Sequence, residues 1–289
     1  MCIRDRAGIT HPKATFLIET CEESGSFDLP PYLDVLTEDL GNPDLIVVLD
    51  SGGPSYEHIW VTEALRGLVA GNLSVRVSHE GVHSGMSGGA IPSSFRIQRM
   101  LLDRVENSQT GEVLIPEMHV QISEKIKREA IALAEILGDE LWTSLPVVQT
   151  LESQSKESSE MLLDINWRPA LSIIGADGIP SVQTAGNVLR TNTDLKLSFR
   201  IPPGVKADEA QEILKQVIEK NPPYGAEVTY KPTEPADGFH APPLHEGVAS
   251  ALESASIHLT GHLPMATWIG GTIPSVSYTH LTLPTNREV

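Results

Sequence analysis

Three carboxylates stand directly after two apolar segments that are predicted to be strands. Glu22 and Glu23 follow the β-prone run 14–20, and Asp50 follows the run 45–49. In open α/β sheets, functional sites lie beyond the carboxyl ends of the strands. Clustered carboxylates are costly unless a cation neutralises them. The spacing therefore predicts a metal site with one carboxylate left over to act as a base.

The elements that must position these acids alternate between strand and helix. A helix predicted over 30–40 separates the two apolar runs, and this order is typical of a parallel βαβ unit. Alternating apolar residues predict further half-buried strands, and apolar stripes with a helical period predict further helices. The predicted strands are 60–66, 73–78, 170–174, 195–201, 226–230 and 265–268, and the predicted helices are 92–106, 126–137, 210–218 and 244–259.

These elements predict an α/β fold in two domains. A parallel-sheet domain is expected from 1–70 and 241–289, and an α+β domain from 71–240 is expected to be inserted into it. The length of 289 residues and the hydrophobic content of 40% suit a globular protein of that size.

The charge and the composition exclude several classes of partner. A net charge of −17 disfavours nucleic acid and anionic membranes, which reward basic patches. No apolar stretch approaches the ~20 residues of a membrane span, and no secretory signal is visible. With only Cys2 and Cys21, the sequence has no disulfide framework, so a cytoplasmic location is expected.

The two ends read poorly as protein sequence. Residues 1–6 and 275–289 resemble translated adapter-like sequence, and the tail has no helical period. We expect that the natural protein is longer on both sides, although an ordinary frayed terminus is the alternative.

Six motifs in one order carry a family resemblance. They are Cys-Glu-Glu-Ser-Gly-Ser, Asp50 after its apolar run, Gly-Val-His-Ser-Gly-Met-Ser-Gly-Gly, Gly-Asn-Val-Leu, Ser-Phe-Arg-Ile-Pro-Pro-Gly and Gly-Gly-Thr-Ile-Pro. Over about residues 10–274 the chain resembles the zinc-dependent exopeptidases of the carnosine dipeptidase, glutamate carboxypeptidase and aminoacylase family, with the dipeptidase branch nearest. The resemblance implies a zinc-peptidase domain with an inserted lid and dimerisation domain.

The resemblance implies a role for each acid and for one histidine. Glu22 resembles the general base, and Glu23 and Asp50 resemble ligands of two divalent metal ions, zinc first, with manganese or cobalt as alternatives. His83 resembles the lid histidine that reaches the active site of the neighbouring subunit in a homodimer.

The resemblance also implies the substrate groups. Asn187 and Arg200 resemble the substrate-binding groups of the lid, and Gly271 and Thr272 resemble the loop that cradles the substrate terminus. Arginine offers a two-pronged donor that suits a carboxylate. The implied substrate is a short peptide or an N-acyl amino acid.

The sequence departs from this family where metal ligands are concerned. The His-x-Asp motif and bridging Asp expected upstream, and the last His ligand expected downstream, are absent in that form. Two ligands hold zinc poorly, so we expect this chain alone to be inactive and its parent to be a hydrolase. Two alternatives stay open, which are a non-catalytic dimerisation or binding module and an amidohydrolase such as a deacetylase or carbamoyl hydrolase.

Each residue also has a plain structural interpretation. The glutamate pair could be solvated surface, Asp50 a helix cap or turn former, and His83 a hydrogen-bonded structural residue. Asn187 or Thr272 could simply shape a turn, and Arg200 could be a surface cation. The His79–His83 segment also matches the His-Glu-x-x-His zinc pattern, but that motif requires a helix, and the glycines that follow disfavour one.

Overall fold

The computed structural model describes residues 13–21, 26, 28–49 and 52–272. The chain divides into two compact units, Met1–Asp50 with Ile273–Val289 and Ser51–Thr272. The predicted acids Glu22, Glu23 and Asp50 lie outside the described residues.

The described residues of the first unit include two short helices. These are α2 (Leu29–Val35) and α3 (Thr37–Leu40), which together nearly match the single helix predicted over 30–40. The described residues of 14–20 and 45–49 form no strand, so the predicted N-terminal βαβ unit is wrong there. Phe16 is 86% exposed and Leu49 is 93% exposed. A continuous apolar run becomes a strand only when neighbours pair with it and cover both faces, and no described strand pairs with either run.

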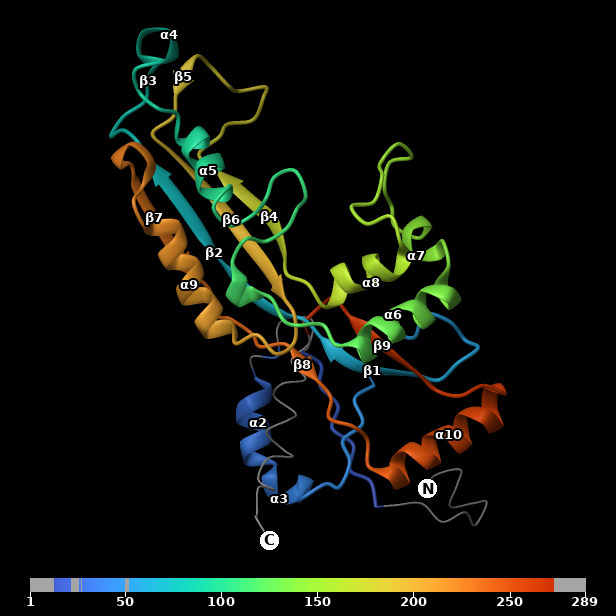
Figure 1. Cartoon of the computed structure of the whole chain (residues 1–289). Helices are drawn as coiled ribbons and strands as arrows, with labels where there is room; N and C mark the ends of the chain where they lie inside the picture. The colour runs from blue at the N-terminus through green and yellow to red at the C-terminus, as the bar shows by residue number, and fades with distance from the viewer. Residues whose placement is uncertain (1–12, 22–25, 27, 50–51, 273–289) are drawn as a thin grey trace. The chain divides into compact units, whose positions relative to one another are not determined.

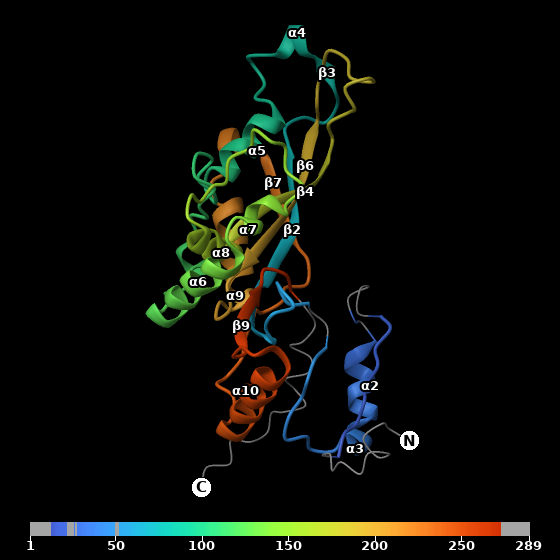
Figure 2. The same ribbon diagram turned by 90° about the vertical axis from the view of Figure 1, so that its right-hand side faces the viewer.

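The larger unit contains a four-stranded antiparallel sheet in the order β4, β6, β2, β7 (Figure 1). Buried and more exposed residues alternate along much of the two central strands, β6 and β2, as the period-two pattern predicts. Helices α5 (Ser94–Leu102) and α9 (Ala207–Glu219) cover one face (Figure 2). The strand bounds are Ala170–Asp177 for β4, Asn192–Ile201 for β6, Gly67–Arg76 for β2 and Glu227–Pro232 for β7.

The core of this sheet lies between its covered face and the two helices. Phe199, Leu73 and Leu214 are fully buried there. Gln98 on α5 is also buried, and its Nε2 donates to the carbonyl oxygens of Leu73 and Thr193 at 3.0 and 2.7 Å. This amide therefore fixes α5 across two neighbouring strands.

The larger unit also contains a three-stranded sheet, with the strand order β8, β1, β9. Strand β1 (Trp60–Leu65) pairs in parallel with β9 (Met265–Ile269) and antiparallel with β8 (Phe239–His240). The rings of Trp167 and Trp268 meet edge to face at 5.7 Å within its apolar cluster. The helices near this sheet are α6 (Glu124–Leu137), α7 (Glu140–Thr143), α8 (Ser158–Asn166) and α10 (Glu246–Thr260).

A short ribbon extends from the four-stranded sheet. It pairs β3 (Val82–His83) with β5 (Val188–Leu189) and carries the small helix α4 (Ser84–Ser87). Figures 1 and 2 both place this ribbon beyond the end of the sheet where β2 finishes and β6 begins. Two 3-10 turns, Pro116–Met118 and Pro223–Gly225, complete the described elements.

The mixed α/β fold predicted from the sequence is confirmed, and most elements of the larger unit match their predicted ranges. Helix α6 ends at Gly138, whose φ of 51° suits glycine at a helix C-terminus. The division into a 1–70 plus 241–289 domain and a 71–240 domain stays a prediction. None of the helices in the described part of the chain has the length and apolar character that a membrane span needs.

Candidate functional site

Two predicted site residues, His83 and Asn187, lie side by side on the ribbon. His83 faces Val188 in the β3–β5 register, and the amide of Ser84 donates to the carbonyl oxygen of Asn187 at 2.9 Å. The Nδ1 of His83 accepts a hydrogen bond from the amide of Gly85 at 3.1 Å, which caps α4. Both side chains are exposed. His83 and Asn187 are called the ribbon group below.

The structure brings a second set of predicted site residues together at a place where several strands end. Strands β1 and β9 are parallel and paired through Leu65 and Ile269, so Arg66 and Gly270 leave the sheet side by side. Strand β6 approaches its end next to the start of β2, where Arg200 lies opposite Leu68. The chain connection between the two sheets thus places the predicted loop residues beside the predicted arginine.

The side chains of Arg200 and Thr272 are in direct contact. The Nη1 of Arg200 donates to the Oγ1 of Thr272 at 2.7 Å. The same hydroxyl donates to the carbonyl oxygen of Arg66 at 2.7 Å. A threonine hydroxyl has one proton to donate and lone pairs to accept with, so both hydrogen bonds can form at once. Arg66, Arg200 and Thr272 are called the crossing group below.

Arg66 is half-buried and holds backbone oxygens rather than a carboxylate. Its Nε donates to the carbonyl oxygen of Gly270 at 2.9 Å, and its Nη1 makes long contacts of 3.5 Å to the carbonyl oxygens of Asp164 and Arg168. Within the described residues no ion pair includes Arg66 or Arg200. Burial lowers the pKa of Arg66 to about 10, and the charge of Arg200 acts in the same direction.

This pair of cations makes the crossing group a candidate anion site. The charges of the two guanidinium groups act on each other, and their hydrogen-bond partners among the described residues are neutral, namely backbone carbonyl oxygens for Arg66 and the hydroxyl of Thr272 for Arg200. One such dipole source is the C-terminal end of α8, which favours a cation. A carboxylate placed at Arg200 would lower the electrostatic energy of both arginines.

The ribbon group and the crossing group lie at opposite ends of β6. Asn192 and Arg200 are eight steps apart on this strand, and at ~3.4 Å per residue this separates them by roughly 27 Å. The ribbon lies beyond the Asn192 end (Figure 1). A dipeptide is shorter than that separation, so the two groups of one chain cannot touch the same small substrate.

The predicted metal ligands Glu23 and Asp50, and the predicted base Glu22, cannot be placed because they lie outside the described residues. No cluster of three or more histidine, cysteine, aspartate or glutamate side chains suited to a metal occurs in the described part of the chain. The metal site therefore stays a prediction.

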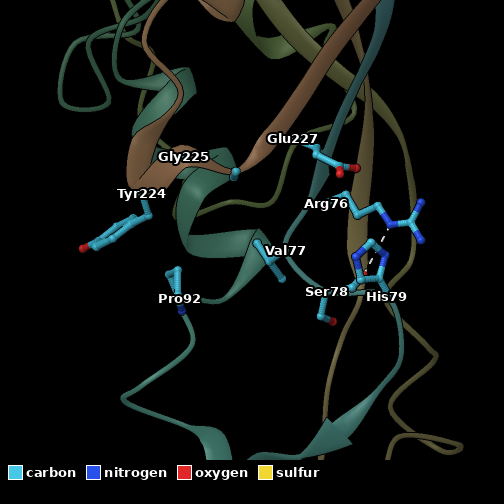
Figure 3. Close-up of a pocket in the computed structure, with 9 residues that line it drawn as sticks. Arg76, Val77, Ser78, His79, Pro92, Tyr224, Gly225 and Glu227 are labelled. Carbon is cyan, nitrogen blue, oxygen red and sulfur yellow. Dashed lines mark hydrogen bonds between the residues drawn. The ribbon is translucent and has the colours of Figure 1, made fainter.

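An open pocket of about 250 Å³ lies at the ribbon end of the sheet (Figure 3), and its lining residues do not belong to the crossing group. Its lining includes Arg76, His79 and Tyr224. The Nε of Arg76 donates to the carbonyl oxygen of Ser78 at 3.3 Å. Residues 79–83 contain no helix, so the His-Glu-x-x-His zinc arrangement does not form.

Sequence reasoning missed Arg66, which it counted as the end of a predicted strand. One signal was present, because a charged residue stands between the apolar residues Leu65 and Leu68 with only Gly67 intervening. Charged residues in such surroundings are rarely buried unless they have partners. The partners themselves come from residues about 100 and 200 positions away, and no sequence pattern indicates them.

The fold is similar to that of solved dipeptidases and of a metallo-carboxypeptidase. It matches human carnosine dipeptidase 1 with a TM-score of 0.69 and 20% identity, over 90% of this chain and 55% of that chain. It matches the dipeptidase Dug1p from Saccharomyces cerevisiae with a TM-score of 0.67 and 20% identity, over 91% and 56%. A third match is the M20 family metallo-carboxypeptidase Sso-CP2 from Sulfolobus solfataricus, with a TM-score of 0.62 and 15% identity over 91% and 58%.

One sequence relative matches most of the chain. The Cys-Gly metallodipeptidase dug1 from Schizosaccharomyces pombe is 24% identical over 204 residues, which are 70% of this chain and 42% of that protein. A stretch of 74 residues is 31% identical to part of a Type 2 DNA topoisomerase 6 protein from Thermococcus kodakarensis, over 26% of this chain and 12% of that protein. No protein-family model matches the chain.

These neighbours match the exopeptidase family predicted from the six motifs. The chain spans about half the length of the dipeptidases that it matches. Activity, substrates and partners of the whole protein are therefore proposals.

Proposed function

We propose that the whole protein is a metal-dependent exopeptidase that hydrolyses dipeptides or related short amides with a free carboxylate. The observation that carries this proposal is the hydrogen bond from Arg200 to Thr272, on a fold shared with dipeptidases. These two residues were predicted separately, from motifs 72 positions apart. Their contact gives a carboxylate a charged donor next to a hydroxyl.

The chemistry of Arg200 suits this role. One of its terminal nitrogens is fixed by Thr272, and the guanidinium makes no other hydrogen bond within the described residues. The remaining N–H groups can therefore point two parallel donors at a carboxylate, which is the strong geometry for this pair. Thr272 holds the guanidinium in place before the substrate arrives, which reduces the entropy lost on binding.

The metal half of the proposal rests on Glu22, Glu23 and Asp50. Two divalent cations, zinc first, would polarise the scissile carbonyl and lower the pKa of a shared water. Glu23 and Asp50 would hold the cations, and Glu22 would accept the proton of the water. Two carboxylate ligands bind zinc weakly, so we propose that this chain alone does not turn substrate over.

The position of the ribbon group supports a site completed by two copies of the chain. His83 and Asn187 lie beyond the Asn192 end of β6, which is itself roughly 27 Å from Arg200, so they can serve a substrate at Arg200 only from another copy. The four-stranded sheet also has an edge strand, β4, with exposed apolar side chains. Ile173 and Ile174 on this strand are 45% and 58% exposed. Exposed edge strands are templates for association.

A binding titration tests the proposal on the chain itself. We expect glycylglycine to bind at least ~10-fold more tightly than glycylglycinamide, which lacks the carboxylate, because a charge-assisted pair contributes about 1.5–3 kcal/mol. Arg200→Gln should remove this preference. Equal binding of the two ligands by the native chain would refute the proposed substrate class.

A second assay addresses turnover. The chain is incubated with zinc or manganese and a dipeptide panel, and free amino acids are measured. We expect none, and hydrolysis by this chain would refute the proposed inactivity while supporting the reaction.

A further inference from the structure

The loop that carries Thr272 is attached to one residue at three points. The backbone amide of Arg66 donates to the carbonyl oxygen of Ile269 at 3.3 Å, and its Nε donates to that of Gly270 at 2.9 Å. Its carbonyl oxygen accepts from the Oγ1 of Thr272 at 2.7 Å. Residues 269, 270 and 272 are therefore all held by Arg66.

The loop has little room to move away from this residue. A Cβ at Gly270 would lie 2.7 Å from the carbonyl oxygen of Ile165 and 3.1 Å from Nη2 of Arg66. The backbone is also closely packed on the other side of Arg66, where a Cβ at Gly67 would lie 2.5 Å from the carbonyl oxygen of Ala236. The guanidinium thus fills the space between the loop and the end of α8.

The positive charge of Arg66 can act on a carboxylate bound at Arg200. Its contacts are neutral carbonyl groups, so its positive charge is not cancelled by a described carboxylate. Arg200 is close enough for the two charges to repel. A substrate carboxylate at Arg200 would relieve this repulsion, so Arg66 favours anion binding without touching the anion.

We infer that Arg66 is a positioning residue for the carboxylate site, which fixes Thr272 and Arg200 through the 269–272 loop and adds a second positive charge behind them. This inference rests on the proposed function, because it assumes that Arg200 receives a carboxylate. It concerns a residue that the motif comparison left without a role.

A matched control exists in the same unit. Arg104 also binds only backbone oxygens, with Nη1 donating to Lys220 at 2.5 Å and Nη2 donating to Asn221 at 2.8 Å. It holds the end of α9 and makes no hydrogen bond to the crossing group. A purely structural role for Arg66 would make the two arginines equivalent in a binding assay.

The test measures carboxylate preference, which is the ratio of the Kd for glycylglycinamide to the Kd for glycylglycine, in the full 289-residue chain. We expect Arg66→Met to lower this ratio at least ~5-fold, because both the loop contacts and the charge are lost. Arg66→Lys should lower the ratio less, because lysine keeps the positive charge but cannot donate to the loop and to the end of α8 at the same time. Arg104→Met should lower the free energy of unfolding and leave the ratio unchanged.

The outcomes separate this inference from the function on which it rests. A folded Arg66→Met chain with the native ratio, alongside an Arg200→Gln chain that has lost its preference, overturns the inference alone. A native chain with no preference overturns both. If Arg66→Met does not fold, Gly270→Ala replaces it, because the added methyl displaces the loop from Arg66 while both arginines remain. Loss of preference in that variant supports the inference, and an unchanged ratio overturns it.

Discussion

His83 and Asn187 lie on a ribbon whose two strands are two residues long, whereas Arg66, Arg200 and Thr272 lie where longer elements end together. The side chains of the ribbon group are exposed. The crossing group is half-buried and joined by hydrogen bonds between residues more than 70 positions apart. Contacts of this second kind fix a binding site before its ligand arrives, while a local ribbon is free to meet a partner.

The largest expected difference between the two regions is in stability. Phe199 precedes Arg200 and is fully buried, while Val188 in the ribbon is 44% exposed. Phe199→Ala should lower the free energy of unfolding by about 3–5 kcal/mol, because it leaves a cavity in the core. Val188→Ala should change it by about 0.5 kcal/mol or less. Urea unfolding followed by circular dichroism measures both, and similar losses would contradict the contrast.

The next largest effect is expected on the association of two copies of the chain. Ile174 lies on the outer strand β4 and contributes exposed apolar surface. If two copies meet along this strand, Ile174→Lys should weaken the dimer at least ~10-fold, because the symmetric interface would then bury two lysine charges in place of two apolar side chains. Sedimentation at several concentrations measures this change. Lys196→Ala on the neighbouring strand β6 is the control, and an equal effect of both substitutions would argue against β4.

The smallest effect concerns Asp237, in the segment that links β7 to β8. Asp237 accepts from the amide of Ala207 at 2.8 Å and from the Nζ of Lys206 at 2.9 Å. Burial alone would raise the pKa of Asp237, but these hydrogen bonds outweigh it and hold the pKa below its usual value.

This shift has a definite sign for stability. A carboxylate with a lowered pKa stabilises the fold above its unfolded pKa, and the contribution is lost as the pH falls through the folded pKa. Asp237→Asn should therefore cost up to about 1 kcal/mol at pH 7, and the difference from the native chain should shrink below about pH 4. A difference that persists at about pH 2.5, below the usual aspartate range, would mean that the charge is not the cause.

The sequence predicted the larger unit well because its pattern carried the information. Alternation in 195–201 and the apolar stripe of 126–137 each define one buried face, and a single face needs only one neighbouring layer. The runs 14–20 and 45–49 carry no such alternation. Their apolar, β-prone residues predict buried strands without saying what covers them, and the described residues provide no strands to pair with them.

The candidate site also has residues that the sequence predicts and features that it does not. Motifs predicted Arg200 and Thr272 one by one, and the structure adds their contact. That contact depends on the parallel pairing of β1 with β9 and on the link from β1 to β2, which are properties of the topology. Arg66 could not be predicted as a site residue, because its partners are backbone oxygens and any residue type supplies those.

The central claim is that the ribbon group of one chain meets the crossing group of another. A spin label at Met86→Cys, which is 88% exposed within α4, tests it in a background where Cys2 and Cys21 are replaced by serine. Labelled chains without ¹⁵N are mixed with ¹⁵N-labelled chains that carry no spin label. We expect the amide signals of Gly271 and Thr272 to broaden in the ¹⁵N chains. Sharp signals in a sample that sediments as a dimer, at twice 31.3 kDa, would contradict the account.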